Sequence, residues 1–174
     1  MRLLQNSESD YALLLRWLTD MRVLEWYEGR DQVYTVDRLQ AEWAPDVQRG
    51  EHTTPYIAEL EGRPIGYVQL VDVQPNGSWA FDLFLGETDL WGKGLGTQMS
   101  CSAIKALLAL GARRIVIDPR VVNKRAVRVY EKVGFRKVKV LPGNEVHEGR
   151  AWDCWLMELD FAAFDAYQNT GSSS

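Results

Sequence analysis

The sequence predicts an α/β domain in which helices flank a mixed, mostly antiparallel β-sheet. Strand-like and helix-like segments follow one another along the chain, with no internal repeat and no interior linker. A glycine-rich turn, Gly92-Lys93-Gly94-Leu95-Gly96, stands between an aromatic strand and an apolar helix. The length of 174 residues, 46% of them hydrophobic, is enough for one self-sufficient core. We therefore expect a single domain over residues 1–165 and a flexible tail over 166–174.

Hydrophobic periodicity predicts two helices and three strands in the first half of the chain. Ser7 and Asp10 have the spacing of a helix N-terminus, and Tyr11, Leu14 and Leu18 then recur on one helical face. Residues 25–30 predict a loop, because they combine aromatics with a glycine, and a second helix is expected over 36–47. Strands are expected over 54–60, 65–73 and 79–85, with turns at 61–63 and 75–77.

The second half of the chain alternates helices with strands. A helix is expected over 94–110, ending before Gly111, the residue type that helix C-termini favour. A short strand over 114–117, a helix over 123–133 and strands over 135–140 and 152–160 complete the pattern. This order suits one α/β domain built on a mixed sheet.

Composition narrows the function classes. The net charge of −4 argues against a nucleic-acid partner, because phosphate backbones bind basic faces. The two cysteines, Cys101 and Cys154, have neither metal-ligand nor disulfide-scaffold spacing, so no metal is expected. No apolar run approaches the ~20 residues of a membrane span and no signal peptide is recognised, so a cytoplasmic location without a membrane partner is expected.

The glycine-rich turn has the arrangement of an anion site. A strand, a glycine turn and a helix aim backbone N–H groups and the positive end of a helix dipole at one point. A Walker A loop is excluded because Lys93 is followed by Gly94 instead of Ser or Thr. A dinucleotide fingerprint fits no better, because the three glycines are spaced two and two. A glycine-rich helix entry without a ligand is the alternative at this point.

A second motif, about thirty residues later, strengthens the functional interpretation. It runs from Asn123 through Ala126 and Tyr130 to Gly134-Phe135. The two motifs together resemble the GNAT superfamily of acetyl-CoA-dependent N-acetyltransferases, and the resemblance covers residues 1–160. It implies acetyl-CoA as cosubstrate and a fold in which the strand before the glycine turn and the strand after the next helix splay apart around it.

The resemblance also implies roles for single residues. The turn would hold the pyrophosphate, and Tyr130 would protonate the departing thiolate, with packing against the sheet as the alternative role for that ring. Trp91 departs from the Gln or Arg that usually opens the first motif, which removes one polar contact and leaves the backbone cradle. The implied cofactor-binding residues are Phe84, Leu85, Lys93, Gly94, Leu95, Gly96, Thr97, Asn123 and Arg128.

Two groups of charged residues indicate which ligands the protein would bind. Lys124 and Arg125, with Arg128, crowd the start of a helix, where cofactor phosphates or a solvated basic face would account for them. Asp82 lies mid-strand among apolar residues, where a carboxylate is costly unless paired, and Asp118 ends a strand at the same edge of this fold. Two converging carboxylates favour a polycationic amine as acceptor, while an outward-facing Asp82 is the alternative. We expect Asp82 to bind the amine and act as base through a water, and Asp118 to anchor the amine.

A closer resemblance concerns the acceptor. Glu25-Trp26-Tyr27, Thr54-Pro55-Tyr56-Ile57-Ala58 and Gly62-Arg63-Pro64-Ile65-Gly66-Tyr67 are similar to the aminoglycoside 6′-N-acetyltransferases of antibiotic resistance. This implies acetylation of a 6′-amine, with Trp26 and Tyr27 walling the drug pocket and Asp82 and Asp118 contacting the amines. Glu148 and Asp153, from the acidic C-terminal stretch, are further expected substrate-binding residues.

Other functions remain open. Within the same class, the acceptor would be a polyamine, a siderophore precursor amine or a protein terminus. Siderophore acyltransferases of related fold use a histidine near the acyl site, and neither His52 nor His147 has a matching context. A non-catalytic acyl-CoA-sensing domain would need the cofactor motif but not Tyr130, and a structural or interaction role is a further alternative. The sequence does not distinguish a monomer from a homodimer.

Overall fold

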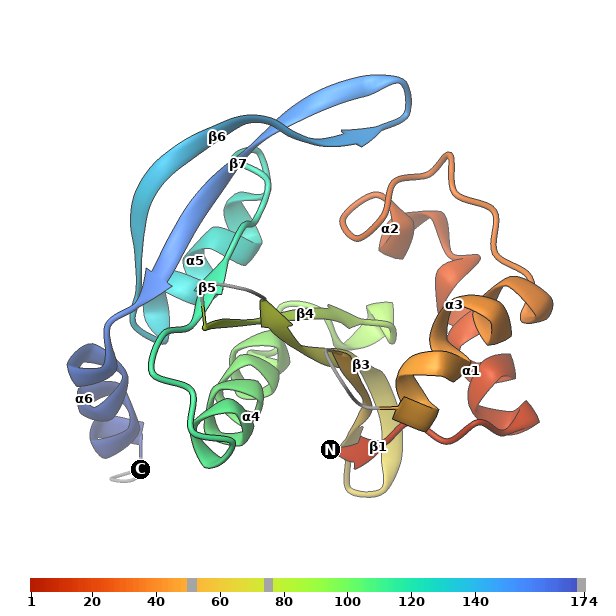
Figure 1. The fold of residues 1–174 in the computed structure, drawn as a ribbon, viewed down its shortest axis with the longest axis horizontal. Helices are drawn as coiled ribbons and strands as arrows, with labels where there is room; N and C mark the ends of the chain where they lie inside the picture. Colours follow the sequence, from red (N-terminus) through yellow and green to blue (C-terminus); the bar gives the residue numbers. More distant parts are fainter. Residues whose placement is uncertain (50–52, 74–76, 172–174) are drawn as a thin grey trace.

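Two antiparallel sheets form the framework of the molecule, and helices lie on both sides of the first sheet (Figure 1). The protein is described by a computed structural model that covers residues 1–49, 53–73 and 77–171. The strands are β1 (Arg2–Leu3), β2 (Thr53–Leu60), β3 (Arg63–Val73), β4 (Ser78–Leu85), β5 (Val116–Ile117), β6 (Phe135–His147) and β7 (Arg150–Leu159). They are ordered β1-β2-β3-β4 in the first sheet and β5-β7-β6 in the second. The helices are α1 (Glu8–Leu18), α2 (Met21–Leu24), α3 (Val36–Arg49), α4 (Leu95–Ala109), α5 (Lys124–Lys132) and α6 (Phe161–Gly171), with a 3₁₀ turn, η1 (Thr88–Leu90).

The two sheets meet at one end of β4 and β5. Trp79 forms a parallel bridge with Ile115, and its N–H donates to the Arg114 carbonyl at 2.9 Å. Past this bridge β4 pairs with β3 and β5 pairs with β7, and no other bridge between β4 and β5 is found in the described part of the chain. The expected splayed strands are therefore confirmed, and the expected mixed sheet consists of two antiparallel sheets joined by one parallel contact.

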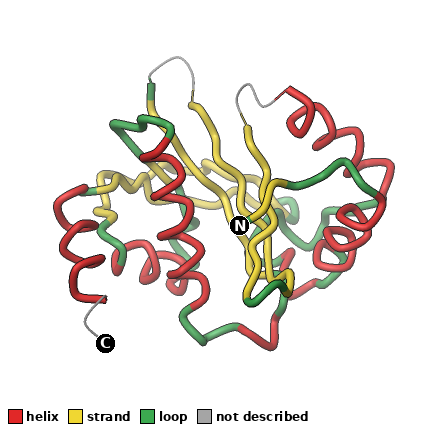
Figure 2. The backbone as a smooth tube through the Cα atoms, turned by 90° about the horizontal axis from the view of Figure 1, so that it is seen from below, coloured by secondary structure: helices red, strands yellow, loops and turns green. Residues whose placement is uncertain are grey.

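Alternating residues of β3 and β4 supply two hydrophobic cores, one on each face of the first sheet. On one face α1, α2 and α3 cover Tyr67 and Phe84. On the other face α4 and α5 cover Val68 and Phe81. Figure 2 shows the strands between the two groups of helices. Because successive side chains of a strand point to opposite faces, neighbouring positions such as 67 and 68 belong to different cores.

Local sequence determines where the two motif helices begin. Gly94 is the N-cap of α4 with a φ of 81°, and Gly111 follows the end of α4 with a φ of 85°, a backbone conformation that glycine adopts without strain. Asn123 is the N-cap of α5, and its side-chain oxygen accepts a hydrogen bond from the Ala126 N–H at 3.1 Å. Each motif therefore places a helix N-terminus beside the gap between β4 and β5.

The C-terminal part differs from expectation in two ways. β6 and β7 are longer than the predicted strands and form one hairpin, closed by Glu148 and Gly149 with φ values of 54° and 67°. The sequence did not indicate this, because residues 141–147 mix Pro, Gly and polar side chains without a two-residue period. The tail expected from residue 166 is corrected to a helix that runs to Gly171 and is anchored by buried Phe164. Residues 172–174, and Pro75 and Asn76 of an expected turn, lie outside the described residues.

Candidate active site

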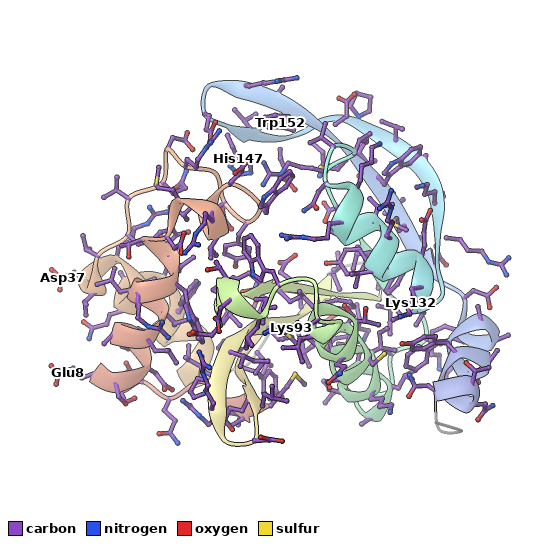
Figure 3. All side chains as sticks on the ribbon, turned by 180° about the vertical axis from the view of Figure 1, so that it is seen from behind. Glu8, Asp37, Lys93, Lys132, His147 and Trp152 are labelled. Carbon is purple, nitrogen blue, oxygen red and sulfur yellow. The ribbon has the colours of Figure 1, made fainter. Side chains whose placement is uncertain are left out.

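A cleft of about 980 Å³ occupies the space where β4 and β5 diverge. Its walls are β4, the first turns of α4 and α5, the turn after α2 and the β6–β7 hairpin. In Figure 3 the hairpin residues His147 and Trp152 lie across the middle of the molecule from Lys93, which precedes α4. The cleft brings together most of the residues that the sequence predicted: Trp26, Tyr27, Asp82, Phe84, Leu85, Gly94, Leu95, Gly96, Thr97, Asp118, Asn123, Arg128 and Tyr130.

One end of the cleft is suited to an anion. Gly94, Gly96 and Thr97 line it, and no side chain caps the first turn of α4, so the orphan amides of that turn are available to a ligand. Lys93 is exposed and does not line the cleft, so the structure does not support its expected role in binding the cofactor. Four cations of α5 also line the cleft: Lys124, Arg125, Arg128 and Lys132.

Trp91, which departs from the family motif, supports one of these cations. The Trp91 indole N–H donates to the Leu85 carbonyl at 2.8 Å, which orients the ring. The Arg125 guanidinium lies over that ring, 4.3 Å from its centroid. A guanidinium from α5 therefore stands beside Trp91, the residue that replaces the usual Gln or Arg of the motif.

Tyr130 combines packing with exposure to the cleft. Its ring packs edge-on against Phe81 and Phe135, with centroids 6.0 and 5.9 Å away, and 9% of the residue is exposed. Burial raises the pKa of the Tyr130 phenol, and the negative charges of Asp82 and Asp118 raise it further. The hydroxyl is therefore protonated at neutral pH and is able to donate a proton.

Asp82 lines the cleft and is exposed within it, so its side chain belongs to the site and does not turn away from it. Gln69, its cross-strand partner on β3, donates from Nε2 to Asp82 Oδ2 at 3.1 Å, and Tyr67 holds the Gln69 oxygen at 2.7 Å. Enclosure by the cleft walls raises the pKa of Asp82 to about 6, and the Asp118 charge contributes in the same direction. Gln69 was not predicted, although its place opposite Asp82 in the β3–β4 hairpin was a usable signal.

Asp118 lies at the end of β5 and faces the same part of the cleft. Its Oδ2 accepts a hydrogen bond from the Asn144 side chain of β6 at 2.8 Å. The hairpin also contributes Glu145 and His147, whose side chains are 3.1 Å apart, and the turn after α2 contributes Glu28. These three residues were not predicted to be part of the site, because no local motif indicates that the hairpin folds over the cleft.

Arg120 connects the walls of this acidic end. It is 6% exposed, and its Nε lies 3.3 Å from Glu145 Oε2. Its Nη2 donates to the Glu25 carbonyl at 2.7 Å, beside the predicted aromatic wall of Trp26 and Tyr27. A buried guanidinium with both partners in place holds the hairpin and the aromatic turn at a fixed separation.

Glu148 and Asp153 are not placed at the cleft, which corrects their expected role in binding the acceptor. The Glu148 carboxylate accepts from the Arg30 side chain at 2.8 Å and from the Arg30 N–H at 3.0 Å, and this pairing lowers the pKa of Glu148 to about 2. Asp153 accepts from the Gly143 N–H at 2.9 Å. Asp153 therefore stabilises the hairpin from within, and Glu148, in the turn of the hairpin, ties it to Arg30.

The cleft therefore has cations and helix amides at one end and carboxylates at the other, with the Tyr130 phenol between them. Such a site suits a reaction between an anionic, phosphate-bearing ligand and a cationic one. In the described residues no group of three or more His, Cys, Asp or Glu side chains is placed to hold a metal ion. No helix within the described ranges is long and apolar enough to span a membrane.

Comparisons with known proteins agree with this geometry. The family model of the acetyltransferase (GNAT) domain matches residues 6–142. An aminoglycoside N(6′)-acetyltransferase type 1 of Klebsiella pneumoniae is 35% identical over 147 residues, which cover 75% of this chain and 71% of the relative. A crystal structure of the aminoglycoside acetyltransferase AAC(6′)-Ib with coenzyme A and kanamycin superposes with a TM-score of 0.77 at 30% identity, covering 96% of this chain and 97% of that one. A spermidine N-acetyltransferase of Vibrio cholerae, solved with coenzyme A and spermine, shares the fold with a TM-score of 0.79 at 18% identity, covering 94% of this chain and 95% of that one.

Proposed function

Because this chain belongs to the GNAT acetyltransferase family, we propose that it transfers the acetyl group of acetyl-CoA to the 6′-amine of an aminoglycoside antibiotic. The observation that carries the acceptor class is the convergence of Asp82 and Asp118 on the Tyr130 hydroxyl in one cleft. The 35% identity to an aminoglycoside N(6′)-acetyltransferase supports the same class. The activity would confer antibiotic resistance.

The cofactor end of the cleft supplies binding. We propose that the amides of Gly94 to Thr97 hold the pyrophosphate, and that Arg125 and Arg128 neutralise its charge. The inner edge of β4 at Phe84 and Leu85 would pair with the amide-bearing arm of the cofactor, and Asn123 would contact that arm from the start of α5. These contacts would bring the thioester between Tyr130 and Asp82.

The acceptor end supplies proton transfer. An ammonium group held by Asp82 and Asp118 would lose a proton to Asp82 through a water, since direct pairing with a carboxylate raises the pKa of the amine. The free amine would attack the thioester carbonyl, so that the C–N bond forms and the C–S bond breaks. Tyr130 would donate its proton to the departing sulfur and recover one from the acylated nitrogen or solvent. The products are the amide, coenzyme A and one released proton.

Further proposals concern the setting of the reaction. We propose that residues 1–165 act as one catalytic domain in the cytoplasm, as a monomer or a homodimer. The substrates would be small molecules, with no nucleic-acid or membrane partner.

Thiol release from acetyl-CoA tests the proposed function. Kanamycin and tobramycin are expected to be acetylated on the 6′-amine, while analogues with a hydroxyl at that position are expected to bind without turnover. Spermidine and an N-terminal peptide serve as competing acceptors in the same assay. Faster turnover of either, or equal turnover of the 6′-hydroxyl analogues, would refute the aminoglycoside assignment and indicate another cationic amine.

Gly94→Val is expected to weaken acetyl-CoA binding on the order of tenfold, because a branched side chain would stand where phosphate approaches the amides. Gly111→Val is the matched control. Both glycines have a φ above 80° and no atom within 4 Å of an added Cβ, but only Gly94 lines the cleft. We therefore expect similar losses of thermal stability in both variants and a change of affinity in one. Calorimetric titration that finds equal affinities would show that the turn is not the phosphate site.

A further inference from the structure

Among the described residues, the acidic end of the cleft contains one carboxylate without a hydrogen-bond or ion-pair partner. Asp82 accepts from Gln69, Asp118 accepts from Asn144, and Glu145 lies between Arg120 and His147. The fourth carboxylate is Glu28, which also lines the cleft. Among the described residues it has neither a hydrogen bond nor an ion pair.

The cations nearest to Glu28 in the sequence are already paired. Arg30 binds Glu148 through its side chain and its backbone N–H. Arg38 donates to Glu42 at 2.7 Å and lies over the Tyr34 ring, 4.3 Å from its centroid. Arg22, on the N-terminal side of Glu28, is likewise paired with Asp20 at 2.6 Å. The fold therefore gives these cations other carboxylate partners and leaves Glu28 to the cleft.

The backbone around Glu28 is held in place. A Cβ added at Gly29 would lie 2.7 Å from the His147 Cβ, so the turn after α2 packs closely on the hairpin. Tyr27 packs against Phe84 of β4 with ring centroids 4.7 Å apart, which fixes the other side of the turn. Glu28 is consequently presented from a wall of the cleft that is different from those carrying Asp82 and Asp118.

An unpaired carboxylate at this position is energetically unfavourable in the absence of a ligand. Glu28 is half-buried. Burial raises the pKa of Glu28, and the Glu145 charge adds to the rise, while the positive forms of His147 and Arg38 oppose it. A cation bound in the cleft would remove this cost.

We infer that Glu28 binds a second ammonium group of the acceptor, opposite the amine that reacts at Asp82 and Asp118. The inference rests on the proposed function and specifies it further: the preferred acceptors carry at least two amines, spaced to reach two walls of the cleft. Glu28 contributes to acceptor affinity and selectivity, and it takes no part in proton transfer.

Glu28→Gln tests this inference. The amide keeps the shape and removes the charge, so KM for kanamycin is expected to rise on the order of tenfold, while kcat and KM for acetyl-CoA change less than about twofold. For a mono-amino sugar that carries only the reacting amine, KM is expected to stay the same. The increase for kanamycin should shrink when salt is raised well above ~0.1 M, because screening weakens the lost attraction.

Glu25→Gln is the matched control, because it removes the same charge three residues away and does not line the cleft. An unchanged KM for kanamycin in Glu28→Gln, or equal increases for both acceptors, would overturn the inference while the wild-type activity stands. Absence of aminoglycoside turnover in the wild type would refute the proposed function instead. Thermal unfolding separates a structural role: loss of an unpaired carboxylate should leave the melting temperature at pH 7 unchanged or higher, and a lower one would contradict the inference.

Discussion

Tyr130→Phe is expected to lower kcat by about 10²–10³-fold and to leave acetyl-CoA affinity nearly unchanged, because it removes one donor to the departing sulfur. The ring contacts with Phe81 and Phe135 do not involve the hydroxyl, so the fold should keep its stability. Single-turnover measurements with saturating acetyl-CoA and kanamycin would give the chemical rate directly, and calorimetry would give the affinity.

Tyr11→Phe provides the control for removing a buried phenol oxygen. The Tyr11 hydroxyl is buried in the α1 core without a hydrogen-bond partner among the described residues, and it does not line the cleft. We expect unchanged kcat in this variant and equal or higher stability, since an unsatisfied polar atom is removed. If Tyr130→Phe retains a rate within about twofold of the parent, the phenol has only a packing role.

Asp82→Asn is expected to lower kcat/KM at neutral pH by about 10²-fold or more and to change its pH dependence. The pKa of Asp82 is raised to about 6, so the carboxylate is protonated below that pH and able to accept a proton above it. The wild-type profile of kcat/KM should therefore rise through pH 6, and this rise should be absent in the variant. A pH series from 5 to 9 with kanamycin would record both profiles.

Asp118→Asn distinguishes a base from an anchor. If Asp118 only binds the amine, its variant should raise KM and keep an ascending limb. That limb should lie below pH 6, because the Asp118 charge contributes to the raised pKa of Asp82. Asp165→Asn, on the exposed side of α6, should change neither. A profile for Asp82→Asn that still rises at pH 6 would assign the ascending limb to another group and remove Asp82 as the base.

The raised pKa of Asp82 also makes the stability of the folded protein depend on pH. A carboxyl group whose pKa is higher in the folded than in the unfolded chain binds more protons when folded, so stability falls as pH rises from about 4 to about 6. The Asn side chain does not ionise, and the variant should lose that part of the pH dependence. Its melting temperature above pH 6 should equal or exceed that of the parent.

The site residues that were predicted correctly are those whose positions depend on short separations along the chain or on the implied fold. Gly94, Asn123 and Tyr130 act within single turns or helices, where spacing along the chain determines position in space, and they line one cleft as expected. Asp82 and Asp118 lie near each other because β4 and β5 diverge from one bridge. The resemblance had implied that the two carboxylates lie at the same edge of the fold.

The residues that were missed depend on long-range packing. Glu28 and Glu145 are far apart in the sequence and line the same cleft only because the hairpin folds over the turn after α2. The register of that hairpin, with shifts between Leu141 and Glu145, could not be derived from residue types. Glu148 was misassigned for the same reason, since its partner Arg30 lies 118 positions away.

The divergence of β4 and β5 also affects the stability of the protein before a ligand binds. Past the Trp79 bridge, each of the two sheets presents a strand edge inside the molecule, and unpaired strand edges favour association with other chains. A cosubstrate lying along β4 would act as the missing strand. Its binding would stabilise the folded chain by about 2.7 kcal/mol at a hundred times its dissociation constant. The supply of acetyl-CoA in the cell would then regulate how long the enzyme survives as well as how fast it works.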